Sequence, residues 1–234
     1  MGCCYCFDKT GRMKWWRQPV NHELATATVA TLKPGGPLAF LVGGTFNSCA
    51  GLAVSGAECF NAFASHRLTV IRAADLDGDK ANEVLIGGQD NYVHLHDAGG
   101  KRRWMHNVGG AVSGLAVADV DGDGKPEIIA TTAELNYNVF ALTPDGKRLW
   151  QAKAGEEVNA LAVGNVTGRG RPDIVVGTDG GEVLVLDGAG KKVVGAALSS
   201  AVAKLALCPA GTPGRHDVLV GLKDGQVRRL SVAR

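Results

Sequence analysis

Short alternations of apolar and polar residues, separated by glycine-rich turns, fill most of the chain. The alternation has the period that a half-buried β-strand requires, because successive side chains of a strand point to opposite faces of the sheet. No stretch sustains the period of about 3.6 residues that marks an amphipathic helix. The pattern therefore predicts an all-β chain.

The strands recur in a fixed order. The phrase V-H-L-H-D-A-G-G-K-R-R-W ends at Trp104, and V-F-A-L-T-P-D-G-K-R-L-W ends at Trp150. C-Y-C-F-D-K-T-G-R-M-K-W, which ends at Trp15, has the same shape, and residues 183–194 form a further copy with valine at the tryptophan place. Each unit of roughly 45 residues reads as four strands, called a, b, c and d in chain order.

The strand positions follow from this alignment. In the unit from Ala111 we expect strands at 113–118, 127–132, 138–142 and 148–151. In the unit from His66 we expect them at 68–73, 83–87, 92–96 and 102–106. The unit from Glu157 gives 160–164, 173–177, 182–186 and 192–195, and the last unit gives 203–207, 217–221 and 226–230. A divergent unit gives 27–32, 38–43, 51–54 and 59–64.

Four-stranded antiparallel units that repeat along a chain predict a β-propeller, because radial packing of the blades buries both faces of each sheet. We expect one domain, 1–234, of about five blades. Its parts are a closing hairpin at 1–16, a divergent blade at 21–65, and repeat blades at 66–107, 108–153, 154–197 and 198–234. The chain begins on strands c and d and ends on a, b and c, so strand 12–16 is expected to complete the last blade and give a monomer. Residues 4–8 and 226–231 both have the strand c pattern, and a fragment of a longer propeller is the alternative.

Two loops between strands a and b carry regularly spaced carboxylates, at the first, third, fifth and ninth places of the loop. These are Asp119, Asp121, Asp123 and Glu127 and, 44 residues upstream, Asp75, Asp77, Asp79 and Glu83. Together with the carbonyl of Lys125, such oxygens suit a calcium ion. Solvated turn formers that bond to their own backbone are the alternative. In the third loop Arg169 takes the place of the third acid, and we expect its guanidinium to replace the ion. The fourth loop keeps only Asp217, so we expect no metal there.

Composition narrows the classes of partner. Lys and Arg number 25 against 23 Asp and Glu, so no nucleic-acid partner is indicated. No apolar run reaches the ~20 residues of a membrane span. Cys49 and Cys59 could meet in a disulfide across a hairpin, and small buried thiols are the alternative.

The loops A-D-L-D-G-D-K-A-N-E and A-D-V-D-G-D-G-K-P-E resemble FG-GAP repeats, also called VCBS repeats, of integrin-alpha-like propellers. The resemblance implies calcium at the eight carboxylates, commonly seven blades, and binding more often than catalysis. It also suggests an extracellular or cell-surface location, although no secretory segment is visible. The phrases that end in tryptophan resemble the tryptophan-docked blades of quinoprotein propellers.

The loops from b to c and from d to a vary in sequence, and variation on a repeated scaffold is where binding specificity can lie. They form a possible ligand face, suited to a sugar or a peptide, which comprises Asp90, Asn91, Tyr92, His106, Asn136, Tyr137 and Asp179. The c–d turns are basic, which fits either protection of sheet edges or contact with an anionic polymer. His94 and His96 lie on one face of a predicted strand and could form half of a metal site. Ordinary, partly exposed strand histidines are the alternative.

No residues are predicted to be catalytic, since the common motifs of hydrolases, zinc proteases and nucleotide-binding enzymes are missing from the sequence. The sequence favours a calcium-stabilised binding or scaffold module for a protein or a glycan. The alternatives are a domain or fragment of a polysaccharide-degrading or quinoprotein-like enzyme and a purely structural repeat.

Overall fold

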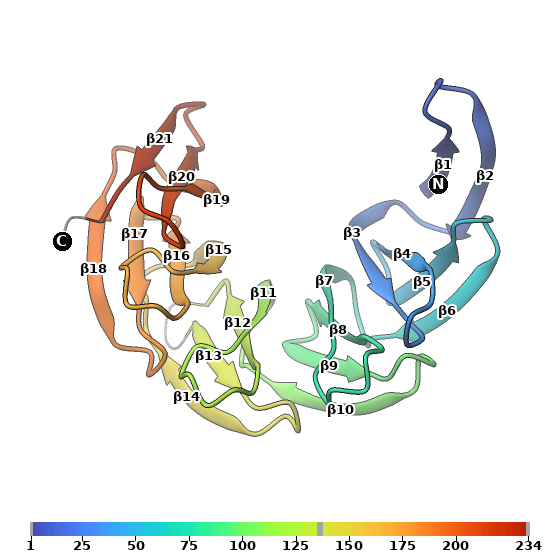
Figure 1. The fold of residues 1–234 in the computed structure, drawn as a ribbon, viewed down its shortest axis with the longest axis horizontal. Helices are drawn as coiled ribbons and strands as arrows, with labels where there is room; N and C mark the ends of the chain where they lie inside the picture. Colours follow the sequence, from blue (N-terminus) through green and yellow to red (C-terminus); the bar gives the residue numbers. More distant parts are fainter. Residues whose placement is uncertain (1, 135–137, 233–234) are drawn as a thin grey trace. The chain divides into compact units, whose positions relative to one another are not determined.

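The computed structural model describes residues 2–134 and 138–232, and every regular element in them is a β-strand (Figure 1). A two-stranded hairpin of β1 (Gly2–Phe7) and β2 (Met13–Val20) is followed by four four-stranded sheets and one three-stranded sheet, all antiparallel. The prediction of an all-β chain is confirmed. No helix of the described residues is long and apolar enough to cross a bilayer.

The five sheets after the hairpin are called blades I to V. Blade I holds β3 (Leu24–Thr31), β4 (Leu38–Gly44), β5 (Ser48–Ala53) and β6 (Glu58–Phe63). Blade II holds β7 (Leu68–Ala74), β8 (Glu83–Gly88), β9 (Tyr92–His96) and β10 (Arg102–Asn107). Blade III holds β11 (Val112–Ala118), β12 (Glu127–Thr132), β13 (Val139–Leu142) and β14 (Arg148–Ala152). Blade IV holds β15 (Val158–Gly164), β16 (Asp173–Thr178), β17 (Glu182–Leu186) and β18 (Lys192–Ala197). Blade V holds β19 (Val202–Pro209), β20 (His216–Leu222) and β21 (Val227–Leu230).

The chain divides into two compact units, Met1–Asn107 and Val108–Arg234. In the first unit, one face of blade I packs on blade II through buried residues that include Leu41, Leu68 and Ile71. In the second unit, blade III packs on blade IV and blade IV on blade V, again through valine, isoleucine and leucine side chains. Within the second unit blade IV is thus covered on both faces, which explains why all six residues of its strand b, β16, are buried and do not alternate with exposed ones.

Burial falls from the second strand of a blade to the fourth. All six residues of β8, β12 and β16 are buried, whereas β10 and β18 are mostly exposed. The sheet order explains this, because strand b lies inside its sheet and strand d lies at the edge. Charged residues on strand d are therefore free to stay in water and discourage edge-to-edge pairing.

Two of the recurrent tryptophans join neighbouring sheets. Trp15 Nε1 donates to the Val54 carbonyl at 2.9 Å, and Trp150 Nε1 donates to the Gly188 carbonyl at 2.8 Å. Each ring lies over a glycine with positive φ in the next c–d turn, Gly56 for Trp15 and Gly190 for Trp150. A Cβ on Gly190 would lie 2.6 Å from the Trp150 ring, so a larger residue there would push the tryptophan out.

In the N-terminal part, the register of the strands decides where the cysteines lie and how the hairpin pairs. The disulfide alternative is wrong, because the register places Cys49 opposite Ala62 on β6, and Cys49 and Cys59 are both free thiols. Burial raises the pKa of Cys49 to about 12. The hairpin pairs β2 with β1, and ring closure by strand 12–16 stays a prediction.

Candidate metal centre

The loop between β11 and β12 is folded around the carboxylate of Asp119. Its two oxygens accept hydrogen bonds from the backbone N–H groups of Gly122, at 2.6 Å, and Gly124, at 3.0 Å. Both glycines have a positive φ, 84° and 87°, a conformation that costs other residues about 1–2 kcal/mol. Asp123 accepts a bond from the N–H of Lys125 at 2.8 Å. The acids therefore hold the turn through bonds to its backbone. The alternative prediction, in which they are solvated turn formers without a metal, requires the same bonds.

Three of the four expected ligands in this loop converge. Asp119, Asp121 and Glu127 each offer a carboxylate oxygen, and these oxygens all lie within 4.8 Å of one another. Glu127 is only 3% exposed, and its Oε2 accepts the N–H of Val120 at 2.9 Å. Asp123 is not part of this group. The loop thus gathers one buried and two accessible carboxylates around a small volume.

The loop between β7 and β8 repeats this arrangement. Asp75 accepts bonds from the N–H groups of Gly78, at 2.7 Å, and Lys80, at 3.0 Å. Oxygens of Asp75, Asp77 and Glu83 lie within 4.8 Å of one another, and the fourth expected ligand, Asp79, again lies outside the group and bonds to the N–H of Ala81.

An arginine distinguishes this loop from the loop of blade III. Arg103 Nη1, from β10 of the same blade, lies 2.8 Å from Asp77 Oδ2, and Arg103 Nη2 lies 3.5 Å from Glu83 Oε1. Among the described residues, no basic side chain forms an ion pair with Asp119, Asp121 or Glu127. The two carboxylate groups therefore have the same shape and a different charge balance.

The buried glutamates of the two loops are poorly placed to carry a charge without a cation. Burial raises the pKa of Glu83 and of Glu127, and the neighbouring loop aspartates raise both further. A backbone N–H lowers the pKa of each glutamate in part, and Arg103 does so for Glu83. The electrostatics of both loops therefore favour a bound positive charge.

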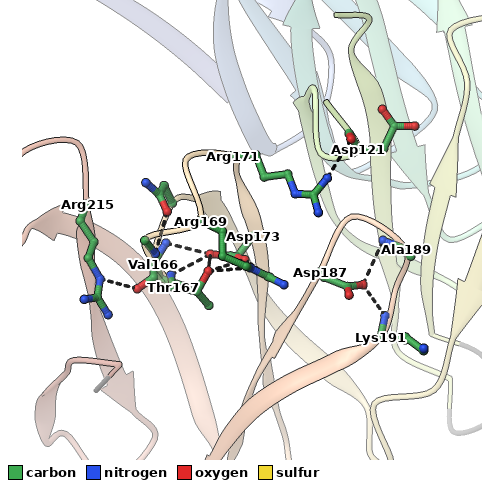
Figure 2. Close-up of polar contacts among 12 residues, drawn as sticks. Asp121, Val166, Thr167, Arg169, Arg171, Asp173, Asp187, Ala189, Lys191 and Arg215 are labelled. Carbon is green, nitrogen blue, oxygen red and sulfur yellow. Dashed lines mark hydrogen bonds and ion pairs between the residues drawn. The ribbon is translucent and has the colours of Figure 1, made fainter. Parts of the chain in front are cut away.

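Blades IV and V place a guanidinium beside the acid at the ninth place of the loop (Figure 2 shows blade IV). Arg169 Nη2 lies 2.5 Å from Asp173 Oδ1, and Thr167 also donates to Asp173. In blade V, Arg229 Nη2 lies 2.6 Å from Asp217 Oδ2. Asp173 accepts the N–H of Val166 at 3.0 Å, so it has the same backbone role as the two glutamates. An internal cation at Arg169 matches the expectation from the sequence.

Arginines also tie the loops of blades IV and V, each to the loop of the blade before it. Arg171 Nη1 donates to the Asp121 carbonyl at 3.0 Å, and Arg215 Nε donates to the Val166 carbonyl at 2.9 Å (Figure 2). A Cβ on Gly188 would lie 2.0 Å from the Val120 carbonyl oxygen, so only glycine allows this close contact between blades. The carboxylate loop of blade III is therefore fixed in part by blade IV.

The possible ligand face divides between the two units. Asp90 and Asn91 lie in the b–c turn of blade II, Tyr92 begins β9, and the end of β10 with His106 runs beside β9. Asp179 belongs to the b–c turn of blade IV, where it accepts bonds from Asn159, at 2.8 Å, and from Lys223. Asn136 and Tyr137 lie outside the described residues. A ligand at this face stays a prediction.

The histidines of β9 have a structural environment. His94 Nε2 lies 2.7 Å from Asp90 Oδ2, which also accepts the N–H of Ser65 at 3.0 Å. His94 is 0% and His96 1% exposed, and burial, with a smaller effect of His94, lowers the pKa of His96 to about 4. Neither histidine belongs to the metal-capable groups found among the described residues. Asp90 thus serves to join the b–c turn to the blade interior.

Comparison with known proteins supports the resemblance noted from the sequence. Residues 66–130 match the model of the FG-GAP-like repeat, and this stretch contains blade II, β11, most of β12 and both carboxylate loops. No curated protein sequence matches the chain.

Solved structures extend the comparison to the whole fold. A crystal structure of BBS1N in complex with ARL6DN, soaked with lead, has a TM-score of 0.74 and 18% identity and covers 98% of this chain and 72% of that chain. The same complex soaked with mercury has a TM-score of 0.75 and 18% identity, with 98% and 71% covered. At 18% identity, the similarity to these two structures shows the fold alone. The chain therefore has a β-propeller fold, and its residues 66–130 match the FG-GAP-like repeat.

Proposed function

We propose that this chain is a β-propeller scaffold that binds a protein partner, and that calcium stabilises it at the loops 119–127 and 75–83. One observation carries the calcium proposal. The acid at the ninth place of the loop faces an arginine in blades II, IV and V, whereas Glu127 of blade III has no cationic side-chain partner among the described residues. A buried carboxylate without a counter-charge is costly, and a bound cation would remove that cost.

The donor set fits a hard cation. Asp119, Asp121 and Glu127 offer only carboxylate oxygens, which suit calcium and magnesium and not a softer metal. Calcium accepts more ligands and a more flexible geometry than magnesium, and a loop of this kind has further oxygens in the Lys125 carbonyl and in water. When bound, calcium would neutralise the carboxylates and fix the turn from strand a to strand b. The residues of this loop would hold the ion and perform no chemistry on it.

The loop of blade II is expected to bind more weakly. Arg103 already contacts both Asp77 and Glu83, so an incoming ion must displace a guanidinium or share the carboxylates with it. We therefore expect two calcium sites of unequal affinity, with the tighter one at 119–127.

The partner is proposed by analogy of fold. BBS1N, which shares this fold, is described in complex with ARL6DN, so a propeller of this kind can present a surface to another protein. Blades III, IV and V, which arginine and tryptophan contacts join, are suited to that role, because they hold exposed loops in fixed positions.

Calorimetric titration of calcium into chelator-treated protein tests the metal proposal. We expect one tight and one weak site in the wild type, and loss of the tight site alone in the double variant Asp119→Asn, Glu127→Gln. Arg103→Ala should strengthen the weak site. Asp173→Asn, in the loop that already holds Arg169, is the matched control and should leave both sites unchanged. No heat at millimolar calcium, or uptake that none of these substitutions changes, would refute the proposal.

The binding role needs a separate measurement. Proteins cross-linked to the immobilised chain would be purified and titrated back, and a glycan array would be probed in parallel. Saturable binding of a purified protein supports the proposal. Binding to glycans alone, or to nothing in either format, would replace it with a glycan-binding or a purely structural role.

A further inference from the structure

Arg171, in the a–b loop of blade IV, contacts the carboxylate loop of blade III without pairing with its acids. Its Nη1 donates to the backbone carbonyl of Asp121 at 3.0 Å (Figure 2). Among the described residues, no carboxylate forms an ion pair with Arg171. The guanidinium therefore holds the backbone of the neighbouring loop and does not take up its carboxylate oxygens.

The residues at the second and third places of the loop in blade III each have two roles. Val120 donates its N–H to Glu127 Oε2 at 2.9 Å, and a Cβ on Gly188 would lie 2.0 Å from its carbonyl oxygen. Asp121 offers its carboxylate to the metal-capable group, while its carbonyl accepts the bond from Arg171. The same two residues thus connect the converging acids to blade IV.

The contact between the two blades is incompletely packed at this point. A cavity of about 350 Å³ lies beside it, and Asp121, Trp150, Arg171 and Gly188 are among its lining residues. Trp150 fixes only the far side, where its Nε1 donates to the Gly188 carbonyl at 2.8 Å. Because side chains do not fill this space, the place of Asp121 relative to blade IV depends strongly on its hydrogen bond from Arg171.

Arg103 in blade II shows the opposite arrangement. It lies 2.8 Å from a carboxylate oxygen of Asp77 and 3.5 Å from one of Glu83, so it takes up oxygens that an ion needs. Arg171 donates to a carbonyl and leaves the converging carboxylates of its neighbour available. One arginine therefore competes with a cation, and the other holds the loop that would bind it.

We propose that Arg171 is a positioning residue for calcium at loop 119–127, and that it couples calcium binding to the contact between blades III and IV. This role rests on the calcium site proposed above and adds what regulates its affinity. A loop that is only partly in its binding conformation has an affinity reduced by that fraction. Coupling is reciprocal, so calcium should strengthen the contact between the two blades by the factor by which the contact strengthens calcium binding.

Charge and position make opposite predictions for the loss of this side chain. A guanidinium near the loop repels a cation, so by charge alone its removal should tighten calcium binding. If its hydrogen bond positions Asp121, its removal should weaken binding even though a positive charge is lost. Arg171→Met separates the two effects, because methionine has neither the charge nor the donor. Arg171→Lys keeps both and should bind calcium nearly as the wild type does.

Calorimetric titration of calcium into the chelator-treated chain measures the tight site in each protein. We expect at least a roughly fivefold higher dissociation constant for Arg171→Met. The matched control is Arg215→Met. Arg215 has the same place in the loop of blade V, and its Nε donates to the Val166 carbonyl at 2.9 Å, away from the metal-capable acids. Because Arg215 also donates to the Val232 carbonyl, the control should lower the melting temperature and leave calcium binding unchanged.

Hydrogen exchange measures the reciprocal effect in the wild type itself, so a variant that fails to fold does not prevent the test. Val166 and Thr167 donate their N–H groups to Asp173 in the loop that holds Arg171, at 3.0 and 2.8 Å. Calcium should slow the exchange of these two amides more than that of Gly181, in the b–c turn of the same blade. In Arg171→Met this difference should disappear.

The outcomes separate this role from the calcium site itself. Equal or tighter calcium binding by Arg171→Met would overturn the role of Arg171 and leave the calcium site in place. So would a loss in Arg171→Lys or in Arg215→Met as large as in Arg171→Met, or exchange that calcium slows equally at Val166 and at Gly181. No calcium uptake by the wild type would refute the calcium site and this role together.

Discussion

The substitution Glu127→Gln should leave the stability of the fold equal or higher without calcium and should lower it, relative to the wild type, when calcium is added. The side chain is 3% exposed and accepts the N–H of Val120. Burial, and then Asp121 and Asp123, raise its pKa. A carboxyl with a raised folded-state pKa supports folding most at acid pH and loses that contribution as the pH rises through the folded-state value. At pH 7 without calcium, Glu127→Gln keeps the acceptor oxygen and removes the strained charge, so stability should stay equal or rise.

The free energy by which calcium stabilises the fold follows from the linkage between binding and folding. At a calcium concentration one hundred times the dissociation constant, one site stabilises the folded state by about 2.7 kcal/mol. For a chain of this size each kcal/mol shifts the melting temperature by roughly 2–4 °C, which gives a rise of about 5–11 °C in the wild type. Loss of one of three carboxylate ligands that weakens binding tenfold would remove about 1.4 kcal/mol, or roughly 3–6 °C of that rise.

Scanning calorimetry at pH 7 with excess chelator and with excess calcium measures both effects. The variant should melt at or above the wild-type temperature in chelator and below it in calcium. Glu83→Gln is the informative comparison, because it also loses the contact with Arg103 and should gain less in chelator. Equal destabilisation of Glu127→Gln in both conditions would mean that the carboxylate only orders the turn, and the reasoning from charge would fail.

Two further predictions concern single backbone and side-chain features of blade II. Lys80 has a φ of 71° at the place where Gly124 stands in blade III, so Lys80→Gly should stabilise the fold by about 1 kcal/mol, and calorimetry that shows no rise in melting temperature would contradict this. The pKa of His96 is lowered to about 4, mainly by burial, with the cationic forms of His94 and Arg102 adding to it and with Asp97 and a bond to the Phe63 carbonyl opposing it. The stability that depends on neutral His96 is complete above the ordinary histidine pKa of about 6.5 and should fall as the pH drops toward 4. An NMR titration that gives His96 a pKa near 6.5 would refute this assignment.

The repeat in the sequence is sufficient to predict the strands of the regular blades. The strand expected at 127–132 is β12, and those expected at 92–96 and 182–186 are β9 and β17. Strand a was placed one or two residues too late in blades III and IV, because the irregular pairing near Gly114 and Ala160 breaks the alternation at its start. The hairpin extends to Val20, beyond the tryptophan phrase, because Val20 packs on blade I through a contact that no local pattern shows.

The carboxylate groups could be predicted only in part. Spacing in the sequence identifies the acids, but it does not tell that Asp79 and Asp123 turn to backbone N–H groups while the ninth residue turns inward. The contact of Arg103 with Asp77 joins positions on strand d and in the a–b loop, 26 residues apart, which meet only when the blade is formed. The sequence could not decide between a disulfide and free thiols at Cys49 and Cys59 for the same reason, since side-chain direction depends on the register of β5 and β6.

All four a–b loops, those of blades II to V, have a buried acid at the ninth place. The side chain that supplies the positive charge beside it differs between blades. In blades II, III and IV the acid accepts the N–H of the second loop residue, a bond that needs an oxygen at that place whatever the neighbouring charge. The balancing guanidinium comes from strand d in blade II, from the same loop in blade IV and from strand c in blade V. Because the backbone requirement is met in the same way each time, we propose that a metal ion at loop 119–127 balances the charge that an arginine balances in the other three blades. It follows that calcium dependence should vary from blade to blade while the β-strands themselves remain the same.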